Sequence, residues 1–240
     1  MSLNTFHSTD GLTRITIGAV VKKEFKHHDA VIRVCNLVNI YKLLKAKQVL
    51  YVDMLDQYSI DFGEHSIGPY IEVKPVGMDA TPRSGLEAFR AVECILQALM
   101  VRLLSFFLLI ISECAIQMMH SGPSPVYHRD IRKPNILKSF SGDEWFLIDW
   151  SDASTAPMRA VRHLSKEEHS PRVHEDNHGA EVDIWGVGFY LRHLASCSRP
   201  LDAQAVKRIA IRWMEDRTIT AEAALKEIHV CWKSPFVTFY

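Results

Sequence analysis

The stretch YHRDIRKPNIL, from Tyr127 to Leu137, carries the strongest signal in this chain of 240 residues. It places Asn135 five residues after Asp130. A carboxylate accepts hydrogen bonds from hydroxyl groups, and amide and carboxylate oxygens are ligands that Mg²⁺ prefers. The stretch is therefore the first candidate for a functional site.

Two further segments follow it in the chain. In WFLIDWSDA, Trp145 to Ala153, an apolar strand leads to Asp149, which stands fourteen residues after Asn135. A hairpin between these positions would bring both side chains to one metal ion. EVDIWGVGFYL, Glu181 to Leu191, reads as a helix that carries Asp183 near its start.

In this order the segments resemble the catalytic half of protein kinases. Asp149-Trp150-Ser151 stands where that family has Asp-Phe-Gly, and HSPRV, His169 to Val173, stands where it has Ala-Pro-Glu. The residues of these motifs are most similar to those of divergent fungal-type protein kinases and of the kinase domains of Crinkler-type effectors. The resemblance covers residues 120 to 231.

The resemblance implies ATP and Mg²⁺ as cofactors and assigns a role to each matching residue. Asp130 would accept the proton of the attacking hydroxyl group, and Arg132 would contact the γ-phosphate. Asn135 and Asp149 would bind Mg²⁺ beside the nucleotide. The residues implied as structural support are His128, Arg129 and Asp183.

The N-terminal half matches the family less well. Strand alternation sends Val20 and Lys22 to the same face, which makes Lys22 the candidate phosphate-binding lysine and Lys23 the competing choice. No Gly-x-Gly-x-x-Gly precedes them, and no acidic residue stands between Asp29 and Asp53 to pair with the lysine. The segment KPVG would be the hinge that meets adenine, through Lys74 and Val76.

Hydrophobic periodicity predicts strands and one helix before this hinge and a mostly helical portion after it. We expect an α+β, two-lobed protein-kinase-like fold in a single domain, with a small, reduced, β-rich N-lobe at about 1–74, the hinge at about 74–77 and the C-lobe at about 78–240. The expected elements are one or two strands over 13–25, a helix over 30–46, strands over 49–58 and 67–73, a helix over 85–100 capped by Ser84, strands over 135–138 and 144–149, and helices from 181 onward.

Composition narrows the class of partner. The 28 basic and 28 acidic residues cancel, so we expect binding neither to nucleic acid nor to a membrane surface. Five scattered cysteines and a polar N-terminus without a secretory signal favour an intracellular location, in the cytoplasm or nucleus. His163, His169, His174 and His178 fit no single helix face, and we assign them surface or packing roles.

The run LLSFFLLIIS, Leu103 to Ser112, is shorter than the roughly 20 apolar residues that a membrane span needs. It is expected to be a buried helix. An unbroken helix from 85 to 120 would be long for such a lobe, so Val101 to Ile111 is interpreted as an insertion.

The leading hypothesis is an ATP- and Mg²⁺-dependent kinase that phosphorylates Ser or Thr hydroxyl groups of a protein substrate. The lost glycines and the missing helix glutamate favour a pseudokinase, a nucleotide-binding or scaffolding module, as the alternative. A third hypothesis is a small-molecule phosphotransferase of the aminoglycoside or choline kinase kind. The sequence indicates neither the substrate nor the oligomeric state.

Overall fold

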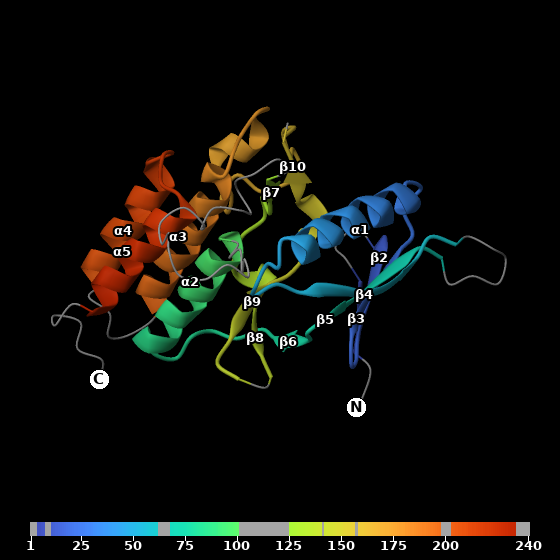
Figure 1. Ribbon diagram of the computed structural model, residues 1–240, viewed down its shortest axis with the longest axis horizontal. Coiled ribbons are helices and arrows are strands. Elements are labelled where there is room, and N and C mark those ends of the chain that lie inside the picture. The colour runs from blue at the N-terminus through green and yellow to red at the C-terminus, as the bar shows by residue number, and fades with distance from the viewer. Residues whose placement is uncertain are drawn as a thin grey trace, which may run out of the picture.

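The computed structural model describes residues 4–7, 11–61, 68–100, 125–140, 142–156, 158–197 and 203–233. A sheet-rich N-terminal part lies beside a helical C-terminal part (Figure 1). The strands are β1 (Asn4–His7), β2 (Thr13–Ile17), β3 (Val21–Phe25), β4 (Met54–Ser59), β5 (Tyr70–Lys74), β6 (Gly77–Met78), β7 (Val126–Tyr127), β8 (Ile136–Ser139), β9 (Trp145–Leu147) and β10 (Ser154–Thr155). The α-helices are α1 (Ala30–Ala46), α2 (Gly85–Leu99), α3 (Glu181–Cys197), α4 (Ala203–Glu215) and α5 (Ala221–Lys233), and the short 3-10 helices are η1 (Lys133–Asn135), η2 (Trp150–Asp152) and η3 (Pro171–His174).

The N-terminal part is an antiparallel sheet in the order β1-β2-β3-β5-β4, with α1 along one of its faces (Figure 1). Apolar side chains recur along α1 at helical spacing, and Val34, Val38, Tyr41 and Leu44 are all buried. The helix contacts β4, η2 and β7. It therefore packs on the sheet, on the strand that leads into the YHRDIRKPNIL stretch and on the short helix that follows Asp149.

The first sheet ends at Lys74, where the chain leaves it for a second sheet. The Lys74–Pro75 peptide bond is cis, and the next strand, β6, belongs to a second sheet in the order β6-β8-β9. Gly77 pairs with Ser139 there, and a Cβ at Gly77 would lie 2.7 Å from the Phe146 ring. Only glycine fits this crossing between the two sheets.

The helical part begins at Ser84, whose hydroxyl accepts a hydrogen bond from the Glu87 backbone N–H at 3.2 Å and caps α2. Helix α2 packs on β9 and α5, and α3 packs on α4. A Cβ at Gly186 of α3 would lie 2.7 Å from the Ile131 carbonyl oxygen, so this helix approaches the stretch around Asp130 very closely. The close approach positions the candidate site.

The sequence predicts much of this arrangement. The helix over 30–46, the cap at Ser84 and the strand pairs on both sides of the break are confirmed, and the chain is mixed α and β with strands first and helices after. The runs Leu103 to Ser112 and Val101 to Ile111 lie outside the described residues. Across the residues the structure does describe, no helix has both the length and the apolar character needed to cross a membrane.

Candidate functional site

The carboxylate of Asp183 holds the loop after β7 in place through two backbone N–H groups of that loop. Asp183 of α3 is fully buried, and its carboxylate accepts hydrogen bonds from the backbone N–H groups of His128 at 3.0 Å and Arg129 at 2.7 Å. Arg129 has a φ of 70°, a left-handed conformation that non-glycine residues rarely adopt. The two hydrogen bonds to Asp183 offset the cost of this conformation.

The side chains of His128 and Arg129 tie the loop to the chain around Asp149. His128 Nε2 lies 3.0 Å from the Ile148 carbonyl oxygen, and its ring meets that of Trp150 edge-on at 4.6 Å between centroids. Because a carbonyl oxygen only accepts, Nε2 carries the hydrogen, and Nδ1 accepts from the Asp130 N–H at 3.3 Å. Arg129 donates through Nε to the Asp152 carbonyl oxygen at 2.5 Å.

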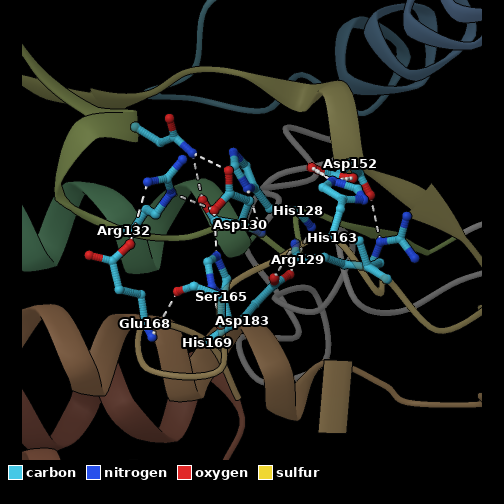
Figure 2. A network of polar contacts seen from close by, with 12 residues as sticks. His128, Arg129, Asp130, Arg132, Asp152, His163, Ser165, Glu168, His169 and Asp183 are labelled. Atoms are coloured by element: carbon cyan, nitrogen blue, oxygen red, sulfur yellow. Dashed lines mark hydrogen bonds and ion pairs between the residues drawn. The ribbon is translucent and has the colours of Figure 1, made fainter. Parts of the chain in front are cut away.

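The carboxylate of Asp130 contacts three other side chains (Figure 2). Its Oδ1 lies 2.7 Å from His169 Nε2 and accepts from Arg132 Nε at 2.8 Å, while its Oδ2 accepts from Asn135 Nδ2 at 2.7 Å. Burial alone would raise the pKa of Asp130, but His169 and Arg132 outweigh it and lower this pKa below its ordinary value. Asp130 is therefore a carboxylate held ionised in a mostly buried place.

The amide of Asn135 is oriented by its partners. Its nitrogen donates to the Asp130 backbone oxygen at 2.8 Å and to Asp130 Oδ2, both of which can only accept. The amide oxygen consequently is the atom that Asn135 can offer to a cation. The Ile148 N–H donates to the Asn135 carbonyl oxygen at 3.0 Å, so the β8–β9 hairpin sets Asn135 beside the chain that enters Asp149.

Asp149 forms an ion pair with a lysine of the N-terminal sheet. Its Oδ1 accepts from Lys23 Nζ at 2.8 Å and from Ser151 Oγ at 2.7 Å. Asp149 has a φ of 64°, and its side chain is 36% exposed. Burial raises the pKa of Asp149 and the Lys23 ammonium lowers it, and the outcome is a pKa well below the ordinary value.

The structure does not bring Lys22, the candidate phosphate-binding lysine, to Asp149. Strand β3 begins at Val21, so Val21, Lys23 and Phe25 share the inward face. Lys22 lies on the other face, where its ammonium pairs with Glu24 at 3.2 Å and lies over the Tyr70 ring. Lys23, the competing choice, is the lysine that contacts Asp149.

A second carboxylate, Asp53, lies close to Lys23. It is 1% exposed and accepts from Trp150 Nε1 at 2.9 Å and from the Tyr41 hydroxyl of α1 at 3.1 Å. Burial raises the pKa of Asp53 to about 7, against the opposing charge of Lys23. Lys23 in turn loses basicity through burial but regains more from Asp149 and Asp53, so its pKa is raised.

The two residues expected at the hinge, Lys74 and Val76, lie where the chain passes from the first sheet to the second. Lys74 ends β5, and its Nζ pairs with Asp56 of β4 at 2.6 Å, which directs the side chain along the sheet. Val76 is partly buried and immediately precedes β6.

Sequence reasoning missed two members of the site. His169 is 5% exposed and contacts Asp130, although the spacing of the histidines indicated only surface or packing roles. Asp53 follows α1 and ends a stretch of the sequence that has no acidic residue. Its signal was the apolar context, because a carboxylate between Val52 and Met54 needs buried partners.

Part of the chain is similar to a known protein. No family model matches the chain. Over 126 residues, 51% of the chain, it is 31% identical to Crinkler effector protein 8 of Phytophthora infestans. The matched region covers 18% of that protein, so the likeness is to a small part of a much longer chain.

Proposed function

We propose that this chain is a protein-kinase-like domain that transfers the γ-phosphoryl group of ATP to Ser or Thr hydroxyl groups of a protein, with Mg²⁺. The observation that carries the proposal is the assembly of Lys23, Asp130, Asn135 and Asp149 from three separate segments through direct hydrogen bonds and the β8–β9 hairpin. The likeness to a Crinkler effector agrees with the family that the motifs resemble.

Asp130 has one position left for a substrate hydroxyl group. A carboxylate oxygen has two lone pairs, and on Oδ1 both are occupied, by His169 and Arg132. On Oδ2 only Asn135 donates, so one lone pair remains. The hydroxyl oxygen forms the new bond to phosphorus, the bond from phosphorus to the β,γ-bridging oxygen breaks with its electron pair on ADP, and the hydroxyl proton passes to Oδ2 of Asp130.

Asn135 and Asp149 are the residues that would hold Mg²⁺. Asn135 offers its amide oxygen, and Asp149 offers the carboxylate oxygen that Lys23 does not occupy. Among the described residues no three His, Cys, Asp or Glu side chains form a ready-made metal cluster, so phosphate oxygens and water would supply the other ligands. When bound, the ion neutralises charge on the phosphates.

Lys23 and Arg132 are the cations for the phosphates themselves. Lys23 reaches the site from β3 with a side chain 11% exposed, and Arg132 remains 34% exposed beside Asp130. Arg132 also lies 3.5 Å from Glu168, so its guanidinium can exchange this weak ion pair for a phosphate.

A second candidate function, the pseudokinase, is favoured by one observation. Helix α1 has no acidic residue, so Lys23 pairs with Asp149, the same carboxylate that the metal needs. If nucleotide and metal do not displace this pair, the chain binds without transferring phosphate. Asp53 favours displacement of the Lys23–Asp149 pair, because its carboxylate interacts electrostatically with Lys23 and would still compensate the ammonium charge.

The test separates binding from transfer. A thermal shift of the purified chain with ATP, with and without Mg²⁺, measures binding, and transfer from γ-labelled ATP to a Ser/Thr peptide library, an aminoglycoside and choline measures activity. The proposal expects a Mg²⁺-dependent shift and labelling of peptide. Binding without labelling selects the pseudokinase, and labelling of a small molecule alone selects the third hypothesis.

A further inference from the structure

We propose that His169 is a positioning residue for Asp130 and that the two side chains share a proton which phosphoryl transfer requires. The catalytic part of this inference rests on the proposed function, whereas the shared proton does not. His169 lies in the segment before η3, far in sequence from Asp130, and both side chains are nearly buried.

The contacts of the ring fix where its hydrogens are. Nδ1 lies 2.9 Å from the Ser165 carbonyl oxygen, which can only accept, so Nδ1 carries a hydrogen. Nε2 lies 2.7 Å from Asp130 Oδ1 (Figure 2). In a neutral ring with its hydrogen on Nδ1, Nε2 would present a lone pair to a carboxylate oxygen.

Two acceptors do not approach to that distance without a hydrogen between them. A second proton must therefore lie between Nε2 and Oδ1, which makes the pair an imidazolium facing a carboxylate, or a neutral imidazole facing a carboxylic acid. Oδ1 also accepts from Arg132 Nε, and this cation favours the ionised carboxylate. The imidazolium form is the one that these contacts support.

The charged groups around the ring act in both directions. Burial and the Arg132 guanidinium lower the pKa of His169, whereas the Asp130 carboxylate and the Ser165 carbonyl raise it, and the pKa of His169 is raised overall. His128 lies beside Asp130 and accepts a hydrogen bond from its backbone N–H, and Glu168 faces Arg132 from the same segment as His169. Of these groups, Asp130 makes the shortest contact with the ring.

The shared proton has a consequence for the reacting oxygen. With His169 and Arg132 on Oδ1, the carboxylate cannot rotate, and the free lone pair stays on Oδ2. Loss of the proton would set a bare Nε2 against Oδ1, and the carboxylate would turn away from its position. Transfer should therefore decline as pH rises through the pKa of His169, because the folded site needs the protonated ring.

The proton itself can be observed without any assay of transfer. Long-range ¹H–¹⁵N spectra of the intact chain distinguish a ring with two protonated nitrogens from a ring with one, and the His169→Gln spectrum assigns the signal. We expect two protonated nitrogens at pH 7, and a pKa that falls in Asp130→Asn. His163, which is 70% exposed and pairs with Asp152, supplies the control signal through His163→Gln.

The positioning role is tested by pH profiles of kcat and of KM for ATP. His169→Gln keeps a donor that can reach Oδ1 but does not titrate, and His169→Leu removes the donor. We expect a loss in kcat within tenfold for Gln and about 10²-fold for Leu, no alkaline decline in either, and a KM for ATP near that of the parent chain. His163→Gln should keep the profile of the parent.

Each result decides one part. A single protonated nitrogen at pH 7 overturns the shared proton. An alkaline decline that persists in His169→Gln overturns the positioning role, as does a Leu variant with unchanged kcat. Should His169→Leu fail to fold by circular dichroism, the Gln variant alone decides. If the parent transfers no phosphate, the proposed function and the positioning role fall together, while the spectra still decide the proton.

Discussion

Lys23 Nζ lies 2.8 Å from Asp149 Oδ1 and joins residues 126 positions apart in the chain. The pair connects β3 of the N-terminal sheet to the segment that leaves β9 in the second sheet. It is the only contact among those described for the site that spans the break at Lys74–Pro75 through charged side chains, so it fixes how the cation and the carboxylate of the site face each other.

Replacement of Lys23 is therefore the most direct test of the nucleotide site. We expect Lys23→Met to weaken ATP binding and to reduce transfer by about 10²- to 10³-fold, because a cation aimed at the phosphates is lost. Lys22→Met is the matched control, since Lys22 pairs with Glu24 on the other face. Titration calorimetry with ATP and the labelled-phosphate assay measure both effects. Equal losses in the two variants would contradict the assignment.

Replacement of Asp130 tests proton transfer. Asp130→Asn keeps the shape of the side chain but removes the base, and we expect turnover to fall by roughly 10²- to 10⁴-fold. Binding of ATP should remain within about threefold of the parent, because no phosphate contact is changed. Single-turnover labelling with saturating ATP is the measurement. An unaltered rate would exclude Asp130 as the base.

The metal requirement should depend on Asp149. Removal of Mg²⁺ with EDTA is expected to abolish transfer, and Asp149→Asn should raise the Mg²⁺ concentration for half-maximal rate by about tenfold or more, because a charged oxygen ligand becomes neutral. Asp143→Asn, at a carboxylate that is 90% exposed, is the control. A Mg²⁺ dependence that is the same in both variants would remove Asp149 from the metal site.

Asp183 should matter for stability before it matters for chemistry. Asp183→Ala leaves the buried N–H group of His128 and that of Arg129 without their acceptor, at a cost of about 1–3 kcal/mol for each group. Urea denaturation followed by circular dichroism measures the change against Asp143→Ala. A difference below about 1 kcal/mol would mean that the loop does not depend on this carboxylate.

Asp53 gives a prediction for pH. Its pKa is about 7 in the folded chain and about 4 when unfolded, so the protonated form is favoured by folding. This stabilisation is complete below about pH 4 and is lost as pH rises through 7, with a slope of up to about 1.4 kcal/mol per pH unit. Asp53→Asn should remove that slope between pH 5 and 7. Urea denaturation of parent and variant at both pH values compares the free energies of unfolding, and parallel curves would show that Asp53 does not titrate in this range.

The fold was predictable where the pattern was local. Seventeen residues of α1 follow from apolar side chains at helical spacing, and the start of α2 follows from the hydroxyl of Ser84. The β8–β9 hairpin follows from two apolar runs with a short polar link. Each of these signals lies within about twenty residues, and no distant contact is needed to form it.

The site was predictable only where a motif spelled it out. Asp130, Asn135, Asp149 and Asp183 could be taken from their order in the chain, but the choice between Lys22 and Lys23 depends on where β3 begins, and one residue reverses the face. Phe25 held the missing signal, because an apolar residue two places on marks the inward face.

Partners from distant segments could not be predicted. His169 is 39 residues from Asp130, and Asp53 is 97 residues from Trp150. The sequence around one residue of each pair does not indicate which distant residue it contacts. Such pairs form because a buried carboxylate must find donors, and the fold alone decides which donors are near.

Gly186 sets the distance between α3 and the loop that carries Asp130, because the missing methyl group leaves room for the Ile131 carbonyl oxygen. Any larger residue at position 186 would therefore push the loop outward by a few tenths of an ångström or more. In the proposed reaction, a displacement that approaches about 1 Å would spoil the alignment of the hydroxyl with the phosphoryl group. The distance between the reacting groups would then depend on α3, which packs against the loop, and on the absence of a side chain at Gly186.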